Sequence, residues 1–325
     1  MNVVIIGCGL IGQKRAKALG ECKLVACVDL IQDKANELAQ QFPGCKTETN
    51  WQKAIALPGV DIVIIATLHA SLAEITYASI QRNLHVLVEK PGARLAAELK
   101  PILNEISNTN SLVRVGFNHR YHRAFRKARS LVDEGALGEL MFIRARYGHG
   151  GRIGYDKEWR SQPELSGGGE LIDQGVHLID LAQWFLGDFN DIQGYAHTYY
   201  WDMPVDDNGF LILKTSKNQV AHLHASCTEW KNTFSFEIYG HHGKLDINGL
   251  GGSYGTERLT FYKMLPEMGP PETQIWEYPM VDNSWQVEFS EFIDDITLRR
   301  QPAANLTHAY KALEIVEEIY RISKS

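Results

Sequence analysis

Cysteine is scarce in this chain and follows no pairing pattern. The 325 residues include only five, Cys8, Cys22, Cys27, Cys45 and Cys227, and no two of them stand in a C-x-x-C spacing. An odd and scattered set argues against a disulfide framework and against a thiolate zinc site, and it fits a reducing compartment. We therefore expect no metal site and a cytoplasmic protein.

Long apolar runs and an excess of positive charge are also missing. No stretch approaches the roughly 20 apolar residues of a membrane-spanning helix, and no basic region precedes the apolar N-terminal stretch as in a signal peptide. The 33 Lys and Arg against 39 Asp and Glu give a formal charge of −6, so there is no overall positive field to hold a polyanion. We expect neither a membrane partner nor a nucleic-acid partner.

The length suggests two domains, and the first 118 residues read as one of them. Short apolar runs alternate there with polar stretches that have apolar residues at three- and four-residue spacing. The expected strands lie at 3–6, 24–28, 62–66, 86–88 and 112–115, and the expected helices at 33–42, 70–82 and 95–107. Such an alternation predicts an α/β domain with a doubly wound parallel sheet.

After Asn118 the pattern changes to strands that follow one another without intervening helices. We expect a helix at 121–133, a strand at 140–147, an apolar helix ending at Leu186, strands at 210–213, 221–227, 234–239 and 259–262, and closing helices at 286–299 and 306–322. This order predicts a second domain, residues 119–325, of the α+β kind, built on an open and mostly antiparallel sheet.

A glycine-rich turn follows the first expected strand. Gly7, Gly9 and Gly12, with Leu10 and Ile11 between the last two, form a G-x-G-x-x-G that opens a helix, which is the context of a dinucleotide-binding turn. Asp29 ends the next strand, where a carboxylate can accept hydrogen bonds from an adenosine ribose. That carboxylate would repel a 2′-phosphate, and no Arg or Lys follows it directly, so NAD is favoured over NADP.

Polar side chains share one face of the apolar helix that ends at Leu186. In a continuous helix Asp173, His177, Asp180 and Trp184 fall at i, i+4, i+7 and i+11. A carboxylate and an imidazole one turn apart on an apolar helix need polar groups or a polar ligand as hydrogen-bond partners. An imidazole can also accept a proton near neutral pH. The pair fits a proton-transfer site, a satisfied structural histidine, or two of three metal ligands.

Lys90 follows the strand expected at 86–88, within Glu89-Lys90-Pro91. Ligands of open α/β sheets bind outside the carboxyl ends of the strands. A lysine at that edge would lie over the nicotinamide half of a dinucleotide whose pyrophosphate is at the glycine turn.

These motifs together resemble the family of glucose-fructose oxidoreductase, inositol dehydrogenase and MocA. The resemblance rests on the glycine turn, Glu89-Lys90-Pro91, the segment 116–121 and the glycines 167–169 that lead to Asp173 and His177, and it covers essentially the whole chain. It implies a Rossmann domain followed by an α/β domain that commonly makes dimer or tetramer contacts.

The resemblance also implies site residues. Lys90, Asp173 and His177 match the catalytic Lys, Asp and His of the family, and Trp159 and Arg160 match a pair that borders the nicotinamide or the substrate. The cofactor contacts that it implies further are Thr67, Glu89, Lys90 and Asn118. One departure is visible, since Leu68 and Leu72 stand where the family usually has Pro and His after the third apolar strand.

A basic segment lies inside this otherwise acidic chain. Residues 114–160 contain eleven Lys or Arg against five acidic residues. Arginine suits carboxylates and phosphates, and aromatic faces suit sugar rings. We expect the substrate-binding residues to be Lys90, Arg120, Tyr147, Arg152, Tyr155, Arg160, Asp173 and His177, and the substrate to be a sugar acid or a nucleotide-linked sugar ahead of a neutral inositol or aldose.

The function predicted from the sequence is an NAD-dependent dehydrogenase of a sugar or cyclitol. His177 would accept the hydroxyl proton, Lys90 would stabilise the developing alkoxide, and Asp173 would orient the imidazole or the substrate. Two alternatives stay open, an NAD-retaining glycosidase that recycles its cofactor and a non-catalytic NAD-sensing regulator. We expect a homodimer or homotetramer.

Overall fold

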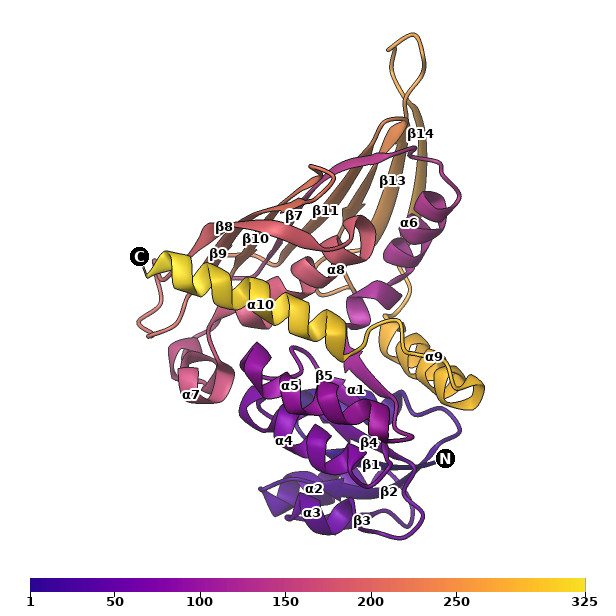
Figure 1. The fold of residues 1–325 in the computed structure, drawn as a ribbon, viewed down its shortest axis with the longest axis vertical. Helices are drawn as coiled ribbons and strands as arrows, with labels where there is room; N and C mark the ends of the chain where they lie inside the picture. The colour runs from indigo at the N-terminus through magenta and orange to yellow at the C-terminus, as the bar shows by residue number, and fades with distance from the viewer. Residues whose placement is uncertain (325) are drawn as a thin grey trace. The chain divides into compact units, whose positions relative to one another are not determined.

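Two compact units make up the computed structural model, which describes residues 1–324 (Figure 1). The first unit contains Met1–Phe117 and Trp285–Tyr310, and the second contains Asn118–Ser284 and the chain from Lys311 onward. Within residues 1–324, no helix combines the length and the apolar character that crossing a membrane requires.

A six-stranded parallel sheet forms the centre of the first unit, in the order β3-β2-β1-β4-β5-β6. Its strands are β1 (Asn2–Ile6), β2 (Lys23–Val28), β3 (Lys46–Glu48), β4 (Ile62–Ile65), β5 (His85–Glu89) and β6 (Val113–Gly116). The helices of this unit's first segment are α1 (Leu10–Lys17), α2 (Gln32–Ala39), α3 (Trp51–Ala54), α4 (His69–Ile80), α5 (Ala96–Glu105) and the 3-10 turn η1 (Ile106–Asn108). The predicted doubly wound parallel sheet is confirmed.

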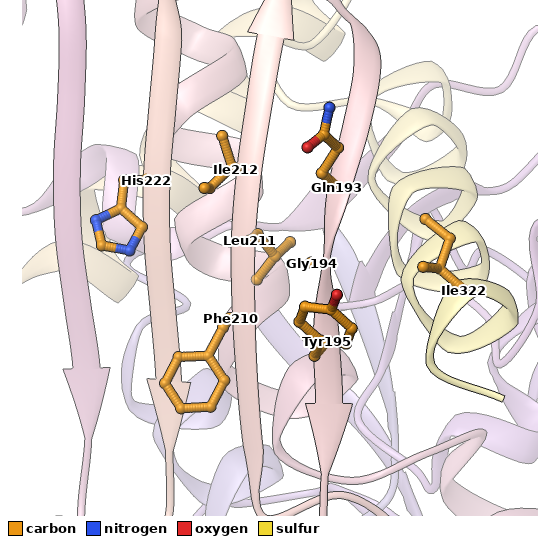
Figure 2. Close-up of a pocket in the computed structure, with 8 residues that line it drawn as sticks. All are labelled: Gln193, Gly194, Tyr195, Phe210, Leu211, Ile212, His222 and Ile322. Atoms are coloured by element: carbon orange, nitrogen blue, oxygen red, sulfur yellow. The ribbon is translucent and has the colours of Figure 1, made fainter. Parts of the chain in front are cut away.

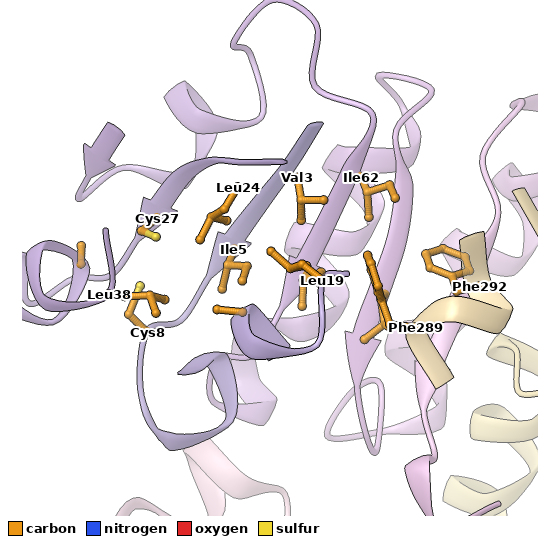
Figure 3. Packing of buried hydrophobic residues seen from close by; sticks show 14 of the residues in the cluster. Val3, Ile5, Cys8, Leu19, Leu24, Cys27, Leu38, Ile62, Phe289 and Phe292 are labelled. Atoms are coloured by element: carbon orange, nitrogen blue, oxygen red, sulfur yellow. The ribbon is translucent and has the colours of Figure 1, made fainter. Parts of the chain in front are cut away.

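The helix α9 (Ser284–Leu298) packs on this first sheet although it is far away in the sequence. Phe289 and Phe292 lie fully or almost fully buried in the cluster that also holds Val3 and Ile62 (Figure 3). The order of the chain predicts that residues 119–325 form one domain. Residues 285–310 instead belong to the first unit, because these two phenylalanines complete its core.

The second unit contains an eight-stranded sheet in the order β14-β13-β12-β11-β7-β10-β9-β8. Its strands are β7 (Leu140–Gly148), β8 (Phe189–His197), β9 (Asn208–Thr215), β10 (Val220–Ser226), β11 (Thr233–Gly240), β12 (Gly243–Asn248), β13 (Glu257–Lys263) and β14 (Glu272–Tyr278). Strands β7 and β10 pair in parallel and the other neighbours pair antiparallel. The predicted mostly antiparallel sheet is confirmed.

The helices of the second unit are η2 (Asn118–Tyr121), α6 (Arg123–Asp133), η3 (Tyr155–Lys157), η4 (Trp159–Ser161), α7 (Pro163–Ser166), η5 (Leu171–Gly175), α8 (Val176–Leu186) and, from Lys311 onward, α10 (Leu306–Ser323). α8 packs on β7 and β10, and α6 packs on β12, β13 and β14. Side chains alternate along β7, so Tyr147 is buried beneath α8 while Arg144 and Arg146 point to the open face.

A surface pocket lies at one edge of the open face (Figure 2). It is lined by residues of β8, β9 and β10 and by Ile322 of α10, and the strand residues include Tyr195, Phe210, Ile212 and His222. Because His222 pairs with Arg144 across the strands, these side chains point away from α8. The pocket is therefore separate from the side chains of α8.

Candidate functional site

The glycine turn has the geometry of a dinucleotide cradle. Gly7 has a φ of 95°, and a Cβ there would collide with the carbonyl of Ala66, while a Cβ on Gly12 would collide with the carbonyl of Gly7. Gly9 is different, because a Cβ on it would meet nothing within 4 Å. The first and third glycines thus serve packing, and the second faces open space at the start of α1, where backbone amides attract an anion.

Asp29 is fixed beside this turn. Its carboxylate accepts hydrogen bonds from the backbone N–H groups of Cys8 and Ile31, each at 2.9 Å. Leu30 and Ile31, which follow it, are exposed and apolar, so no cation stands there to receive a 2′-phosphate. The turn, the helix start and the oriented carboxylate fit NAD. The residues that would hold it in this unit are Gly9, Leu10, Ile11 and Asp29.

A buried ion network holds the end of β5 next to Lys90. Glu89 accepts a hydrogen bond of 2.6 Å from Nε of the fully buried Arg15, which also pairs with Glu288 of α9. The Arg15 guanidinium lies 4.4 Å from the ring centroid of Trp285. Glu89 therefore anchors the end of the strand through Arg15, and its contact with the cofactor stays a prediction.

The segment after β4 departs from the family pattern without losing its structure. Thr67 receives a hydrogen bond of 2.9 Å from the Ser71 hydroxyl, one turn into α4. Leu72, in place of the usual His, is fully buried in the core, and Leu68 precedes the first residue of the helix. Leu72 therefore contributes to the core of the first unit.

Three glycines and a buried acid set up the segment that carries Asp173. A Cβ on Gly168 would collide with the Tyr320 hydroxyl, and one on Gly169 with the carbonyl of Asp206. The Asp206 carboxylate accepts hydrogen bonds from the backbone N–H groups of Gly169 at 2.9 Å and Leu171 at 2.7 Å. Gly168 and Gly169 are therefore required by packing.

Asp173 lies in a π-helical turn, η5, and not in a continuous α-helix. The prediction of one regular helix is wrong at this point, and π-helical turns inside helices are frequent at functional sites. Nε of Arg160 donates a hydrogen bond of 2.8 Å to Asp173, whose charge raises the pKa of Arg160. The Arg160 guanidinium also lies 4.6 Å from the ring centroid of Trp159, so the predicted Trp-Arg pair lies beside the predicted acid.

His177 follows in the first turn of α8 and is only 4% exposed. Its ring stacks on that of His119, with the centroids 3.7 Å apart and the planes at 15°. Tyr147 of β7 is 6.3 Å away, and burial raises the pKa of its phenol well above the usual value. Nδ1 of His119 lies 3.1 Å from Oδ1 of Asn118. The structure thus brings His177 together with a second histidine, His119, which lies in the motif segment 116–121 but was not among the predicted site residues.

Arg120 is 3% exposed and holds Asp180 with two hydrogen bonds, of 2.8 and 2.6 Å. Its guanidinium also lies over the ring of Trp184. Arg120 therefore engages two members of the predicted polar stripe, Asp180 and Trp184. We assign Arg120 to structure and leave it out of the substrate contacts, because its fork is occupied by an internal carboxylate.

A second acid in this unit was not predicted. Glu170 is almost fully buried, accepts a hydrogen bond of 3.2 Å from the Tyr155 hydroxyl and lies 3.4 Å from Nε2 of His149. The Arg152 side chain is 64% exposed, pairs with Glu158 at 2.7 Å and lies over the ring of Tyr155. Glu170 stands directly after the glycines, which was the only sequence signal for it.

Within residues 1–324 no three His, Cys, Asp or Glu side chains are arranged to hold a metal ion.

Two family models match the chain, one over each unit. The first, described as oxidoreductase family, NAD-binding Rossmann fold, matches residues 1–117, and the second, the GFO/IDH/MocA C-terminal domain, matches residues 125–246. Together they cover most of the chain.

Curated relatives act on several ring-bearing substrates, as their names state. Levoglucosan dehydrogenase of Pseudarthrobacter phenanthrenivorans is 28% identical over 230 residues, which is 66% of this chain and 58% of that protein. Inositol 2-dehydrogenase of Salmonella typhimurium is 21% identical over 92% of this chain and 87% of its own length. The dTDP-3,4-didehydro-2,6-dideoxy-alpha-D-glucose 3-reductase of Saccharopolyspora spinosa is 24% identical over 76% of this chain and 74% of its own.

Solved structures share the fold over the full length. Levoglucosan dehydrogenase in complex with NADH and levoglucosan superposes with a TM-score of 0.90 at 22% identity, covering 100% of this chain and 97% of the other. GenD2 from gentamicin A biosynthesis in complex with NAD has a TM-score of 0.84 at 22% identity, covering 100% and 94%.

Proposed function

The chain belongs to the GFO/IDH/MocA oxidoreductase family, with its NAD-binding Rossmann fold and its C-terminal domain, and on that premise we propose that it oxidises a secondary hydroxyl of a sugar or cyclitol with NAD. The observation that carries the proposal is the oriented pair of the second unit, Asp173 held by Arg160 and His177 held by stacking on His119. The glycine turn and Asp29 of the first unit support NAD as the cofactor. Bound NAD would supply the hydride acceptor.

The three proposed catalytic residues have distinct tasks. His177 accepts the proton of the substrate hydroxyl, and its buried position between His119 and Tyr147 limits the orientations of the imidazole. Asp173 hydrogen-bonds the substrate or orients the imidazole, with its own position fixed by Arg160. Lys90 supplies positive charge for the developing alkoxide. Trp159 and Asn118 border the cofactor or the substrate in this assignment.

Arginine pairing informs the choice of substrate. Arg120, Arg152 and Arg160 each have a carboxylate partner within the chain, so none of them stands as a dedicated receptor for an anion. We propose a neutral sugar or cyclitol as the first candidate. This reverses the order expected from the sequence, because that expectation rested on counting arginines without their partners.

An anionic or nucleotide-linked sugar is the second candidate. It is favoured by the exposure of Arg152, which could exchange Glu158 for a ligand carboxylate or phosphate. The nucleotide-sugar reductase among the relatives points the same way.

The test is a screen of the purified protein with NAD that records NADH formation across free sugars, inositols, sugar acids and nucleotide sugars. Net NADH that rises in proportion to the sugar added supports the dehydrogenase. Sugar turnover without net NADH would indicate a glycosidase that recycles its cofactor, and NAD binding without turnover on any substrate would indicate a sensor.

We also propose that the chain forms a homodimer or homotetramer through the open face of the eight-stranded sheet. That face combines the apolar and aromatic pocket of Figure 2 with alternating charges from Arg144, Glu237 and Lys244. Sedimentation of the wild type and of Ile212→Asp tests it, since a monomeric wild type contradicts the proposal.

A further inference from the structure

Four aromatic side chains of the second unit form a continuous run of ring contacts, which we call the aromatic run. Trp230 lies 4.6 Å from Tyr200, Tyr200 lies 5.3 Å from Trp201, and Trp201 lies 5.6 Å from Tyr155, measured between ring centroids. Exposure rises along it, from the buried Tyr155 to Tyr200 at 60% and Trp230 at 65%. Large aromatic rings are therefore presented to solvent at one end only.

The buried end of the run meets the proposed catalytic segment. The Tyr155 hydroxyl donates to Glu170, which stands three residues before Asp173. Burial raises the pKa of the Tyr155 phenol, and the negative charges of Glu170 and Asp173 raise it further. The run thus leads from the residues next to Asp173 out to solvent.

Hydrogen bonds hold the backbone that carries Tyr200 and Trp201. The fully buried Asp207 carboxylate accepts hydrogen bonds from the backbone N–H groups of Tyr200 at 2.7 Å and Trp201 at 3.1 Å. Nε1 of Trp201 donates to the carbonyl of Cys227 at 3.0 Å. A loop backbone fixed in this way loses little further freedom when a ligand packs on the rings that it carries.

The backbone of Trp230 is held in an unfavourable conformation. Its φ is 58°, a region in which the Cβ of an L-residue crowds the carbonyl oxygen. Gly150 makes room for it, since a Cβ there would lie 3.1 Å from the Trp230 Cα, and a Cβ on Gly151 would collide with the Trp201 ring. Strained residues of this kind cluster at ligand sites.

We propose that Trp230 and Tyr200 form an outer subsite that binds a second pyranose ring, so that the substrate is a glycoside of at least two rings. This inference rests on the proposed dehydrogenase, whose reacting hydroxyl lies at Asp173 and His177. The C–H faces of a pyranose pack on flat aromatic rings, and Trp and Tyr give large rigid contact areas. The exposed Arg152–Glu158 pair, next to the Tyr155 ring, offers donors and acceptors for sugar hydroxyls.

The test compares monosaccharides with disaccharides on the full chain with NAD. Glucose, galactose and mannose are measured against cellobiose, maltose and lactose, both by NADH formation and by calorimetric binding with NADH present. We expect one or more of the disaccharides to exceed its monosaccharide in kcat/KM by about tenfold, the effect of one well-placed aromatic contact.

Substitutions then locate the subsite. Trp230→Ala and Tyr200→Ala are expected to lower kcat/KM for that disaccharide about tenfold, through KM, and to affect the monosaccharide several-fold less. Trp230→Gly removes the ring and also suits the positive φ, so it separates the loss of the ring from backbone strain.

The matched control is Tyr199→Ala. Tyr199 lies in the same loop, is equally exposed and shares the backbone hydrogen bond to Asp207, but its ring contacts His197 and Phe210 and not the aromatic run. We expect this variant to keep the disaccharide preference of the wild type.

Three outcomes overturn the subsite: no disaccharide preference in binding or turnover, an equal loss for both sugar classes, or a change of oligomeric state in Trp230→Ala without a change in sugar preference. In each of them NADH formation from monosaccharides still supports the dehydrogenase. Conversely, disaccharide binding that depends on Trp230, without any NADH formation, supports the subsite and overturns the dehydrogenase.

Discussion

The imidazoles of His119 and His177 are stacked, with ring centroids 3.7 Å apart and planes 15° from parallel. Two positive charges about 4 Å apart repel by about 4 kcal/mol at an effective dielectric constant near 20. The stack therefore favours states in which no more than one ring carries a proton. Such an arrangement keeps a neutral imidazole available to accept a proton.

Replacing His119 tests this coupling. His119→Phe keeps a flat ring against His177 and removes the repulsion, so His177 holds a proton more readily and the acid limb of kcat/KM against pH moves to higher pH. The profile is measured from pH 5 to 9, with Phe234→Tyr, which alters another ring beside His119, as the control. An unchanged acid limb would show that the stack does not influence the base.

Glycine substitutions separate cofactor binding from folding. Gly9→Ala places a methyl group in open space at an ordinary φ of −70°, so the free protein should keep its Tm while its affinity for NAD falls about tenfold or more. The contrast is Gly12→Ala, whose methyl group collides with the Gly7 carbonyl and should lower the Tm of the free protein. Equal effects of both on Tm would contradict the assignment of Gly9 to the ligand.

Asp29 controls the choice between the two nicotinamide cofactors. Asp29→Ala removes the carboxylate that would bind the ribose and repel a 2′-phosphate, so the Kd for NAD should rise about tenfold and the preference over NADP should narrow. The side chain also accepts two backbone hydrogen bonds, so unfolding of the free protein is expected to become about 1–3 kcal/mol easier. A preference for NAD that survives the change would disprove this role.

Sequence patterns identify most helices and strands of both units and the motif residues. Burial of one or both faces of an element leaves a regular spacing or a short run of apolar residues in the sequence. These patterns missed β3, β8, β12 and β14. Strand β14 has no buried side chain, so its sequence carries no alternation, and β3 is three residues long at an edge. The return of α9 to the first sheet depends on contacts between residues nearly 300 positions apart, which local patterns do not encode.

Site residues, too, are visible in the sequence where local spacing marks them and hidden where distant partners decide their role. Asp173 and His177 were visible from their spacing, although the π-helical turn was not. The ion-pair partners of Arg120 and Glu89 were not visible, because Asp180 and Arg15 lie far away in the sequence. Glu170 had only its place after the glycines to mark it, and His149 had no motif.

The His149–Glu170 contact makes stability depend on pH. Burial opposes the charge on His149, but the hydrogen bond and the charge of Glu170 outweigh it and raise the pKa of His149. A raised pKa means that the contribution to stability is fully present below the unfolded value of about 6.5 and is lost as pH rises through the folded value. The stability gap between wild type and His149→Gln should therefore be larger at pH 6 than at pH 9 in urea unfolding. A gap that widens with pH would contradict this.

The most direct test of the proposed reaction is NADH formation by His177→Asn and Lys90→Met on whichever sugar the wild type oxidises. If His177 is the proton acceptor and Lys90 stabilises the alkoxide, each change lowers kcat about 100-fold or more, while Tm and NAD binding by His177→Asn stay close to wild type. Turnover within a few-fold of wild type in either variant would contradict the assignment of catalytic roles.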